Sequence, residues 1–237
     1  NVNAYGKDLD DSYSMAYLLE DVAKTNIDRI RFVTSHPWDF TDEMIDIMAK
    51  YKNIMPHIHL PVQSGNTKIL KLMGRRYTKE DYLKLYNKLK NKIPNISITT
   101  DIIVGFPNET EEEFNDTILL AEECKFDGAY TFIYSKREGT PAARMSDDIT
   151  QEEKEERLQR LNEIINKYAL INNEKLLNEE VEVLVEGTSE KKSDMLMGYT
   201  DTNKLVNFKG PKELIGQIIK VKITSAKTWS LDGEYVK

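Results

Sequence analysis

The strongest constraint on this chain is an alternation of short apolar runs with amphipathic stretches over its first three quarters. The apolar runs predict strands at 29–34, 58–62, 96–104 and 129–134. Apolar residues at spacings of three and four predict helices at 12–25, 41–51, 78–92 and 110–125. This order is typical of strand–helix units around a parallel sheet, so the sequence predicts an α/β fold.

Two helix starts carry a capping signal. Thr110 with Glu113, and Thr150 with Glu153, fit the pattern in which a hydroxyl and a carboxylate satisfy the first helix amides reciprocally. The second signal begins a long amphipathic helix that we expect to reach Asn178.

The last quarter has a different texture, since five of the eleven glycines lie between short alternating runs such as 181–185 and 218–223. This pattern predicts a small all-β barrel of the oligonucleotide-binding type. We therefore divide the chain into an α/β unit at 1–178 and a β-barrel at 179–237. A closed eight-unit barrel needs about 250 residues, so we expect a partial (β/α) barrel and a chain that is the C-terminal portion of a larger protein.

Composition limits the classes of function. The net charge of −7 means that any nucleic-acid contact must be a local patch or a shaped pocket. No apolar run approaches the length of a membrane helix and no signal pattern precedes residue 5, so we expect a soluble, cytoplasmic protein without a membrane contact. The single cysteine, Cys124, excludes an internal disulfide and a cysteine-built metal site within this chain.

Four predicted strands end in polar or bent segments. These segments are 34–37, 60–65, 102–107 and 134–141. Ligands of parallel sheets bind at the carboxyl ends of the strands, so we expect all four to face one cavity.

Several residues at these ends suit a ligand, each with a plain structural alternative. Gln63 and Ser64 offer donors and acceptors for a ribose or a carboxylate, or form only a helix cap and turn. Gly105 permits a close approach of a planar base, or only a bend. Asp101 lies within a strand, where a carboxylate favours a polar cavity. His36 is a candidate at the rim, or fixes its loop.

Other residues carry weaker signals. His57 and His59 share a strand face, and we favour a hydrogen-bonded pair over metal ligands because a third ligand is missing. Arg75 and Arg76 could hold an anion or lie in a solvated turn. Cys124 is expected to be a small buried hydrophobe.

Taken together, the strand-end segments resemble the radical S-adenosylmethionine (SAM) methylthiotransferases. The resemblance rests on the segments 29–37, 59–65, 101–107 with 109–110, and 139–143. The segments 185–188 and 202–208 are similar to the TRAM domain that ends those enzymes. The resemblance implies a partial barrel of the radical SAM type followed by a TRAM barrel.

Within that family, 34–37 and 203–208 are most similar to the branch that methylthiolates isopentenyladenosine 37 of tRNA. The resemblance implies SAM and two 4Fe–4S clusters as cofactors. One cluster cleaves SAM to a radical that takes the hydrogen from adenine C2, and the second supplies the sulfur. Alternative substrates within the family are threonylcarbamoyladenosine in tRNA and a ribosomal protein aspartate.

The family's cluster cysteines are absent from this chain, so we expect it to be inactive alone and to contain neither catalytic nor metal-binding residues. By position, the resemblance implies contacts of the chain with SAM from Asn1, Ser35, His36, Gln63, Ser64, Asp101 and Gly105.

In the TRAM part, the resemblance and the basic and aromatic composition imply RNA contacts. The candidates are Tyr199, Lys204, Asn207, Phe208 and Lys209, with Phe208 equally suited to the barrel core. The partners implied are the tRNA anticodon stem-loop and a flavodoxin-like electron donor, with the protein a monomer. Two other classes stay open: a non-radical barrel enzyme, and an RNA-binding scaffold without catalysis.

Overall fold

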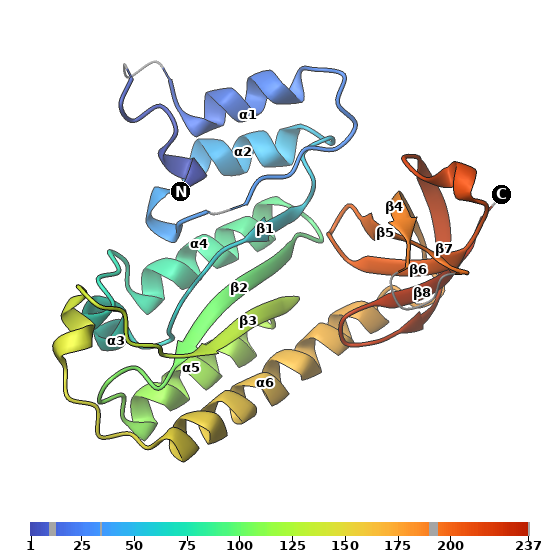
Figure 1. Cartoon of the computed structure of the whole chain (residues 1–237). Coiled ribbons are helices and arrows are strands. Elements are labelled where there is room, and N and C mark those ends of the chain that lie inside the picture. The colour runs from blue at the N-terminus through green and yellow to red at the C-terminus, as the bar shows by residue number, and fades with distance from the viewer. Residues whose placement is uncertain (10–12, 34, 190–193, 237) are drawn as a thin grey trace.

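The computed structural model describes residues 1–9, 13–33, 35–189 and 194–236, which form an α/β unit and a small β-barrel joined by one long helix (Figure 1). The helices are α1 (Met15–Ala23), α2 (Asp42–Lys50), α3 (Thr67–Leu72), α4 (Lys79–Lys92), α5 (Glu111–Cys124) and α6 (Gln151–Glu174). The strands are β1 (His57–His59), β2 (Ser97–Val104) and β3 (Gly128–Ile133), then β4 (Glu180–Thr188), β5 (Leu196–Thr200), β6 (Leu205–Lys209), β7 (Ile218–Ala226) and β8 (Leu231–Tyr235).

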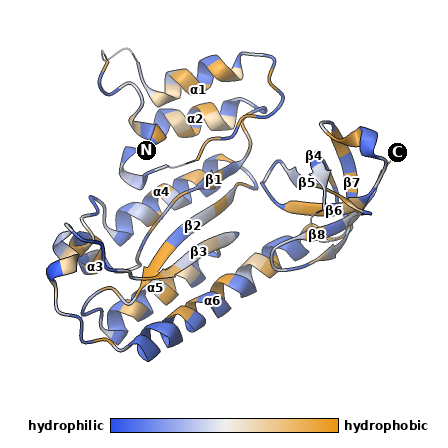
Figure 2. Cartoon of the chain, in the orientation of Figure 1, coloured by the Kyte–Doolittle hydropathy of each residue, from blue (hydrophilic) through white to orange (hydrophobic). Residues whose placement is uncertain are grey.

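The α/β unit is built on a parallel sheet in the order β1-β2-β3. Ile58, Ile98 and Ile102 are fully buried on the face that packs against the helices. The alternating residues of the same strands, among them His59 and Asp101, belong to the opposite face because side chains alternate along a strand. Alternating orange and blue along α6 in Figure 2 marks an apolar face toward this core and a polar face outward.

The expected strand at 29–34 is wrong as a regular element. Within its described residues only Ile30 pairs, through an isolated parallel bridge to Ile54. Val33 is exposed, and Thr34 lies outside the described residues. One bridge is too few for this segment to form a strand of the sheet. Three of the four predicted strands therefore form the sheet.

Other boundaries shift for local reasons. The strand expected at 58–62 ends at His59, because Pro61 has no amide to donate. The sequence does not predict α3, because its six residues are too few to show a helical period. The long helix ends at Glu174 rather than Asn178.

Both predicted capping boxes are confirmed. The Thr110 and Thr150 hydroxyls accept from the amides of Glu113 and Glu153, whose carboxylates bond back to the cap amides. A third box, Thr78 with an aspartate at the same offset, begins α4.

The second unit is a closed five-stranded barrel in the order β4-β5-β6-β8-β7, which confirms the predicted all-β tail. Its core contains Val183, Val206, Val221 and the fully buried Phe208. Across the described ranges of the chain, no helix combines the length and apolar character needed to cross a bilayer.

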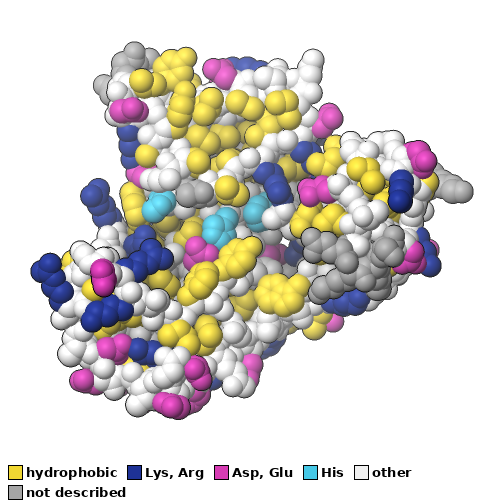
Figure 3. Space-filling view, viewed as in Figure 1, with side chains coloured by type: hydrophobic (Ala, Val, Ile, Leu, Met, Phe, Trp, Pro, Cys, Tyr) yellow, Lys and Arg dark blue, Asp and Glu magenta, His cyan; other side chains and the backbone are white. Residues whose placement is uncertain are grey.

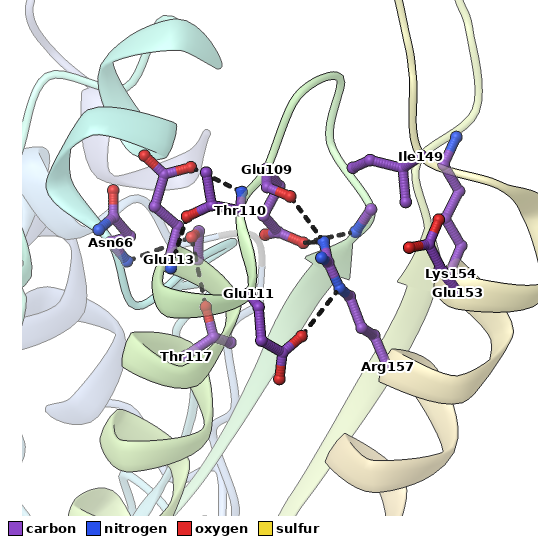
Figure 4. A network of polar contacts seen from close by, with 12 residues as sticks. Asn66, Glu109, Thr110, Glu111, Glu113, Thr117, Ile149, Glu153, Lys154 and Arg157 are labelled. Atoms are coloured by element: carbon purple, nitrogen blue, oxygen red, sulfur yellow. Dashed lines mark hydrogen bonds and ion pairs between the residues drawn. The ribbon is translucent and has the colours of Figure 1, made fainter.

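A buried polar network joins α6 to the carboxyl end of β2 (Figure 4). Arg157 donates to the Glu109 backbone carbonyl at 2.8 Å and lies 3.2 Å from the Glu109 carboxylate. The same carboxylate accepts from the Gly105 amide at 2.8 Å. Burial raises the pKa of Glu109, whereas the Gly105 amide and Arg157 oppose that rise. This network fixes the start of α6 relative to the sheet.

The far end of α6 meets the β-barrel at the amino ends of the strands. Lys204 of the barrel places its ammonium 2.9 Å from Asp127, the residue before β3, and 2.8 Å from the Asn173 side chain on α6. Its side chain is only 12% exposed. Arg29 adds bonds to the backbone carbonyls of Tyr199 and Glu182. The barrel is therefore held against the sheet by polar contacts from both units.

The network predicts a large difference between two neighbouring arginines of α6. Arg157→Met strands a buried carboxylate, so we expect a loss of about 3 kcal/mol in the free energy of unfolding. Arg160→Met removes half-exposed ion pairs with Glu111 and Glu156 and a hydrogen bond to Asn115, but strands no buried charge, so it should cost only about 1 kcal/mol. Urea unfolding of both variants measures this, and equal losses would contradict the role of Arg157.

The junction predicts local opening when Lys204 is replaced. In Lys204→Met, the amides at 126–129 and 227–230 should exchange about tenfold faster, because the contact with Asp127 is lost. Lys209→Met is the matched control, because Lys209 is exposed and its ion pair with the exposed Asp194, at 3.7 Å, is a weak surface contact. Hydrogen–deuterium exchange reports both, and unchanged exchange in Lys204→Met would show that the junction is held by other contacts.

Candidate functional site

A cavity of about 920 Å³ lies on the face of the sheet opposite the helices and extends to the β-barrel. Every second residue of two neighbouring segments lines the cavity. The segment that contains β1 contributes His57, His59, Pro61 and Gln63, and β2 contributes Ser97, Thr99 and Asp101. In Figure 3 the three histidines (cyan) gather in the middle of this face. The alternation that buries isoleucines behind the sheet thus presents polar groups in front of it.

A hydrogen-bonded cluster occupies the middle of the cavity wall. His59 Nε2 lies 3.2 Å from Asp101 Oδ1, and His59 Nδ1 lies 3.0 Å from the Thr99 hydroxyl. The same hydroxyl lies 3.4 Å from His57 Nε2. These contacts agree with the predicted hydrogen-bonded histidines and show that Thr99 links the two rings. Thr99 could have been predicted, because it lies two residues before Asp101 and so on the same face of the strand.

His57 is neutral at ordinary pH. It is 5% exposed, and burial together with the nearby Arg31 lowers its pKa to about 4. Within the part of the chain that the structure describes, no group of three or more His, Cys, Asp or Glu side chains could hold a metal ion. The cluster can accept and donate hydrogen bonds to a polar ligand.

Two segments form the mouth of the cavity, the one that begins at Ser35 and the one that follows β1. Ser35, His36 and Gln63 line it, with Arg75 and Tyr77 beside them. Ser35 is 1% exposed, and its hydroxyl has no hydrogen-bond partner among the described residues. Desolvation and the nearby positive charge of Arg75 lower the pKa of His36.

Gln63 has a left-handed backbone with φ of 71°, which is costly for a residue with a side chain. Its backbone is held by the Asp101 carbonyl at 2.8 Å and by the Ile103 amide at 2.9 Å. The ladder therefore overrides the local preference and fixes the position of Gln63 at the cavity wall.

Other sequence candidates lie away from the cavity lining. The Ser64 hydroxyl accepts from the Asn66 amide at 3.2 Å and lies 3.4 Å from the Thr117 hydroxyl, within a turn that leads into α3. Gly105, with φ of +67°, lies under Lys154 of α6, whose Cγ would be 2.5 Å from an added Cβ. Asn1 donates to the Asp39 carboxylate.

Of the four strand ends expected to share one cavity, two contribute lining residues at their tips. The end of β2 contributes Asp101 from inside the strand, whereas Gly105 and Phe106 lie elsewhere. The segment after β3 leads away toward η3 (Pro141–Arg144). The expectation of four converging ends is therefore corrected to two, because α6 covers the end of β2.

The barrel contributes the opposite wall of the cavity. Tyr199 and Lys204 line it, together with Asn203 and Trp229. Sequence reasoning missed Trp229, for which the chain offers no periodic signal. Asn207 is half-buried and Lys209 is exposed, whereas Phe208 occupies the barrel core. The core position was the open alternative for Phe208.

Comparison with protein families gives two matches along the chain. Residues 2–121 match the radical SAM superfamily, and residues 174–236 match the TRAM domain. Among solved structures, the Escherichia coli coproporphyrinogen III oxidase, a radical SAM enzyme, aligns with 80% of this chain and 45% of its own, at 14% identity and a TM-score of 0.47.

Curated relatives align with the whole chain. The tRNA-2-methylthio-N(6)-dimethylallyladenosine synthase of Bacillus cytotoxicus is 58% identical over 238 residues, and that of Shouchella clausii is 59% identical over 236. The synthase of Staphylococcus aureus is 55% identical over 238 residues. The chain spans 45 to 47% of the length of these relatives. The family match over just more than half of its residues shows that this chain belongs to the radical SAM superfamily.

Proposed function

We propose that this chain is part of a tRNA methylthiotransferase that acts at C2 of isopentenyladenosine 37. The observation that carries the proposal is a sequence identity of 55 to 59% to three synthases of that modified nucleoside. Each alignment covers the whole of this chain. The activity belongs to the longer protein, since this chain spans less than half of each relative.

The cavity supports SAM as the ligand. Radical SAM enzymes bind SAM, and a volume of about 920 Å³ accommodates a nucleoside with an amino-acid tail. The buried Ser35 hydroxyl, which has no partner among the described residues, and the Gln63 amide suit the polar parts of SAM. Asp101 and His36 would face the same molecule, and Asp101 is oriented by His59. Three other candidates would not contact SAM directly. Ser64 would hold the turn before α3, Gly105 the end of β2, and Asn1 the loop that contains Asp39.

An iron–sulfur cluster does not fit the residues of this chain. Cys124 is the only cysteine, is buried, and has its pKa raised to about 12 by desolvation. We propose two 4Fe–4S clusters held by other parts of the longer protein. The role left to this chain is to bind and orient SAM and to exclude water from its reactive end.

The remaining parts of the proposal concern partners. The TRAM match supports an RNA-facing role for the barrel, toward the anticodon stem-loop of tRNA, with Asn207 and Lys209 as the outward candidates. We place the boundary between the units at 178 and 179, between the end of α6 and the start of β4. A flavodoxin-like electron donor, a monomeric state and a cytoplasmic location complete the proposal.

SAM affinity tests the cavity. In the longer protein, Gln63→Ala and Asp101→Ala should each weaken SAM binding about tenfold, because each removes the side chain that would hydrogen-bond the ligand. Gln159→Ala, on the exposed face of α6, is the control. Isothermal titration with SAM and with S-adenosylhomocysteine measures the dissociation constants. Unchanged constants in both cavity variants would remove these assignments.

The nucleosides of cellular tRNA test the reaction. Disruption of the gene should abolish 2-methylthio-N6-isopentenyladenosine and accumulate N6-isopentenyladenosine, as measured by mass spectrometry. A gene that lacks residues 180–237 should fail to restore the product. Loss of the methylthio group from threonylcarbamoyladenosine instead would assign the protein to the other tRNA branch.

A further inference from the structure

The surface charge of this acidic chain is uneven. Residues 68–76 and 134–144 together carry seven basic side chains and one acidic one, although the whole chain has a net charge of −7. Six of these cations define what we call the basic rim: Lys71, Arg75, Arg76, Lys136, Arg137 and Arg144. Such a local excess favours a polyanionic partner.

The two basic segments lie at the same edge of the sheet. One follows β1 through α3, and the other follows β3, and these strands are parallel. The Tyr134 amide continues the ladder to the Val104 carbonyl, and Asn108 then bonds to the Ser146 carbonyl. Arg75 lines the cavity itself. Figure 3 shows Lys and Arg side chains over the end of the molecule where α3 lies.

The six cations of the basic rim form no ion pairs with described residues. In the ranges that the structure describes, none of the six has a carboxylate within 4.0 Å, whereas the neighbouring Lys68 and Lys154 are paired with Glu113 and Asp147. The Arg75 Nε is buried and has no acceptor in the described part of the chain. Charges of one sign held close together without partners repel one another, and a bound anion removes that cost.

Two exposed aromatic side chains lie between the cavity and the rim. Tyr130 is 66% exposed and Phe132 is 50% exposed, and both project from one face of β3. Tyr130 also lines the cavity and packs edge-on to His59 at 5.9 Å. Aromatic rings beside cations form the usual surface for unpaired nucleotides, whose bases stack and whose phosphates pair with Arg and Lys.

We propose that the basic rim, with Tyr130 and Phe132, is an RNA-binding surface that takes the phosphates and loop bases of an RNA hairpin. It lies at the carboxyl edge of the strands, whereas the β-barrel lies at the amino edge. Among the described barrel residues that line the cavity the cation is Lys204, which is already paired with Asp127, so the rim supplies cations without ion pairs. The assignment of a tRNA to this surface rests on the proposed function.

A charge-reversal pair tests the rim. The probe is a fluorescein-labelled RNA hairpin with an anticodon-arm sequence, and the readout is anisotropy between about 50 and 200 mM salt. Arg76→Glu with Arg137→Glu should weaken binding by the whole chain about tenfold or more and lower the salt slope by about 1 to 2. Lys52→Glu with Lys167→Glu is the matched control, because these exposed lysines lie away from the rim and change the net charge equally.

Two further variants keep the test independent of folding. Arg76→Gln with Arg137→Gln should give an intermediate loss, and Tyr130→Ser should weaken the hairpin more than a fully paired duplex. Circular dichroism checks that each variant is folded. Equal binding by the rim and control pairs, or an unmodified chain that does not bind the hairpin, overturns the proposal.

Other partners give distinct results. Binding to phosphatidylglycerol vesicles or to a poly-glutamate peptide as tight as to the hairpin would replace RNA by a general anion surface and overturn the proposal. The proposed function is judged separately, by the modified nucleoside in cellular tRNA. A rim variant with normal RNA binding refutes the rim, whereas an unchanged nucleoside after gene disruption refutes the function.

Discussion

The buried ion pair between Arg157 and Glu109 sets the geometry on which the rest of the structure depends. It anchors the first turns of α6 to the loop that follows β2, with the Gly105 amide as a third member. Because α6 is a single continuous helix of 24 residues, fixing one end determines where the other end meets the β-barrel. The cavity between the sheet and the barrel is a consequence of that placement.

The cavity shows how one simple rule produces both a core and a site. Along β2, Ile98 and Ile102 are buried on the helix side while Thr99 and Asp101 face the cavity. His59 joins the latter pair across the strands. Polar residues at these positions are tolerated because each has a partner, and the exceptions, such as the Ser35 hydroxyl, mark places where a ligand would complete the bonding.

Much of the fold could be predicted because local signals and tertiary structure agree. The capping boxes at Thr110 and Thr150 and the strand near 97–104 combine propensity with period, and the barrel follows from glycine spacing and alternation. The segment 29–34 has the composition of a strand, but strand formation needs a neighbour that pairs along its length.

The site was only partly predictable for a similar reason. Gln63 and His36 could be placed from expected strand ends, and Asp101 from its position within a strand. The burial of Ser64 and the contact of Lys154 with Gly105 depend on how helices pack. Phe208 could not be assigned, since an aromatic residue in an alternating strand suits either a core or a stacking surface. Trp229 reaches the cavity only through the junction between the two units.

The central claim is that this cavity holds SAM in the longer protein. Hydrogen–deuterium exchange of that protein with and without SAM tests it most directly, because it locates the ligand without a substitution. We expect added protection confined to peptides that cover 35–37, 61–65 and 99–105. Protection that omits all three segments, while SAM is bound, would contradict the account.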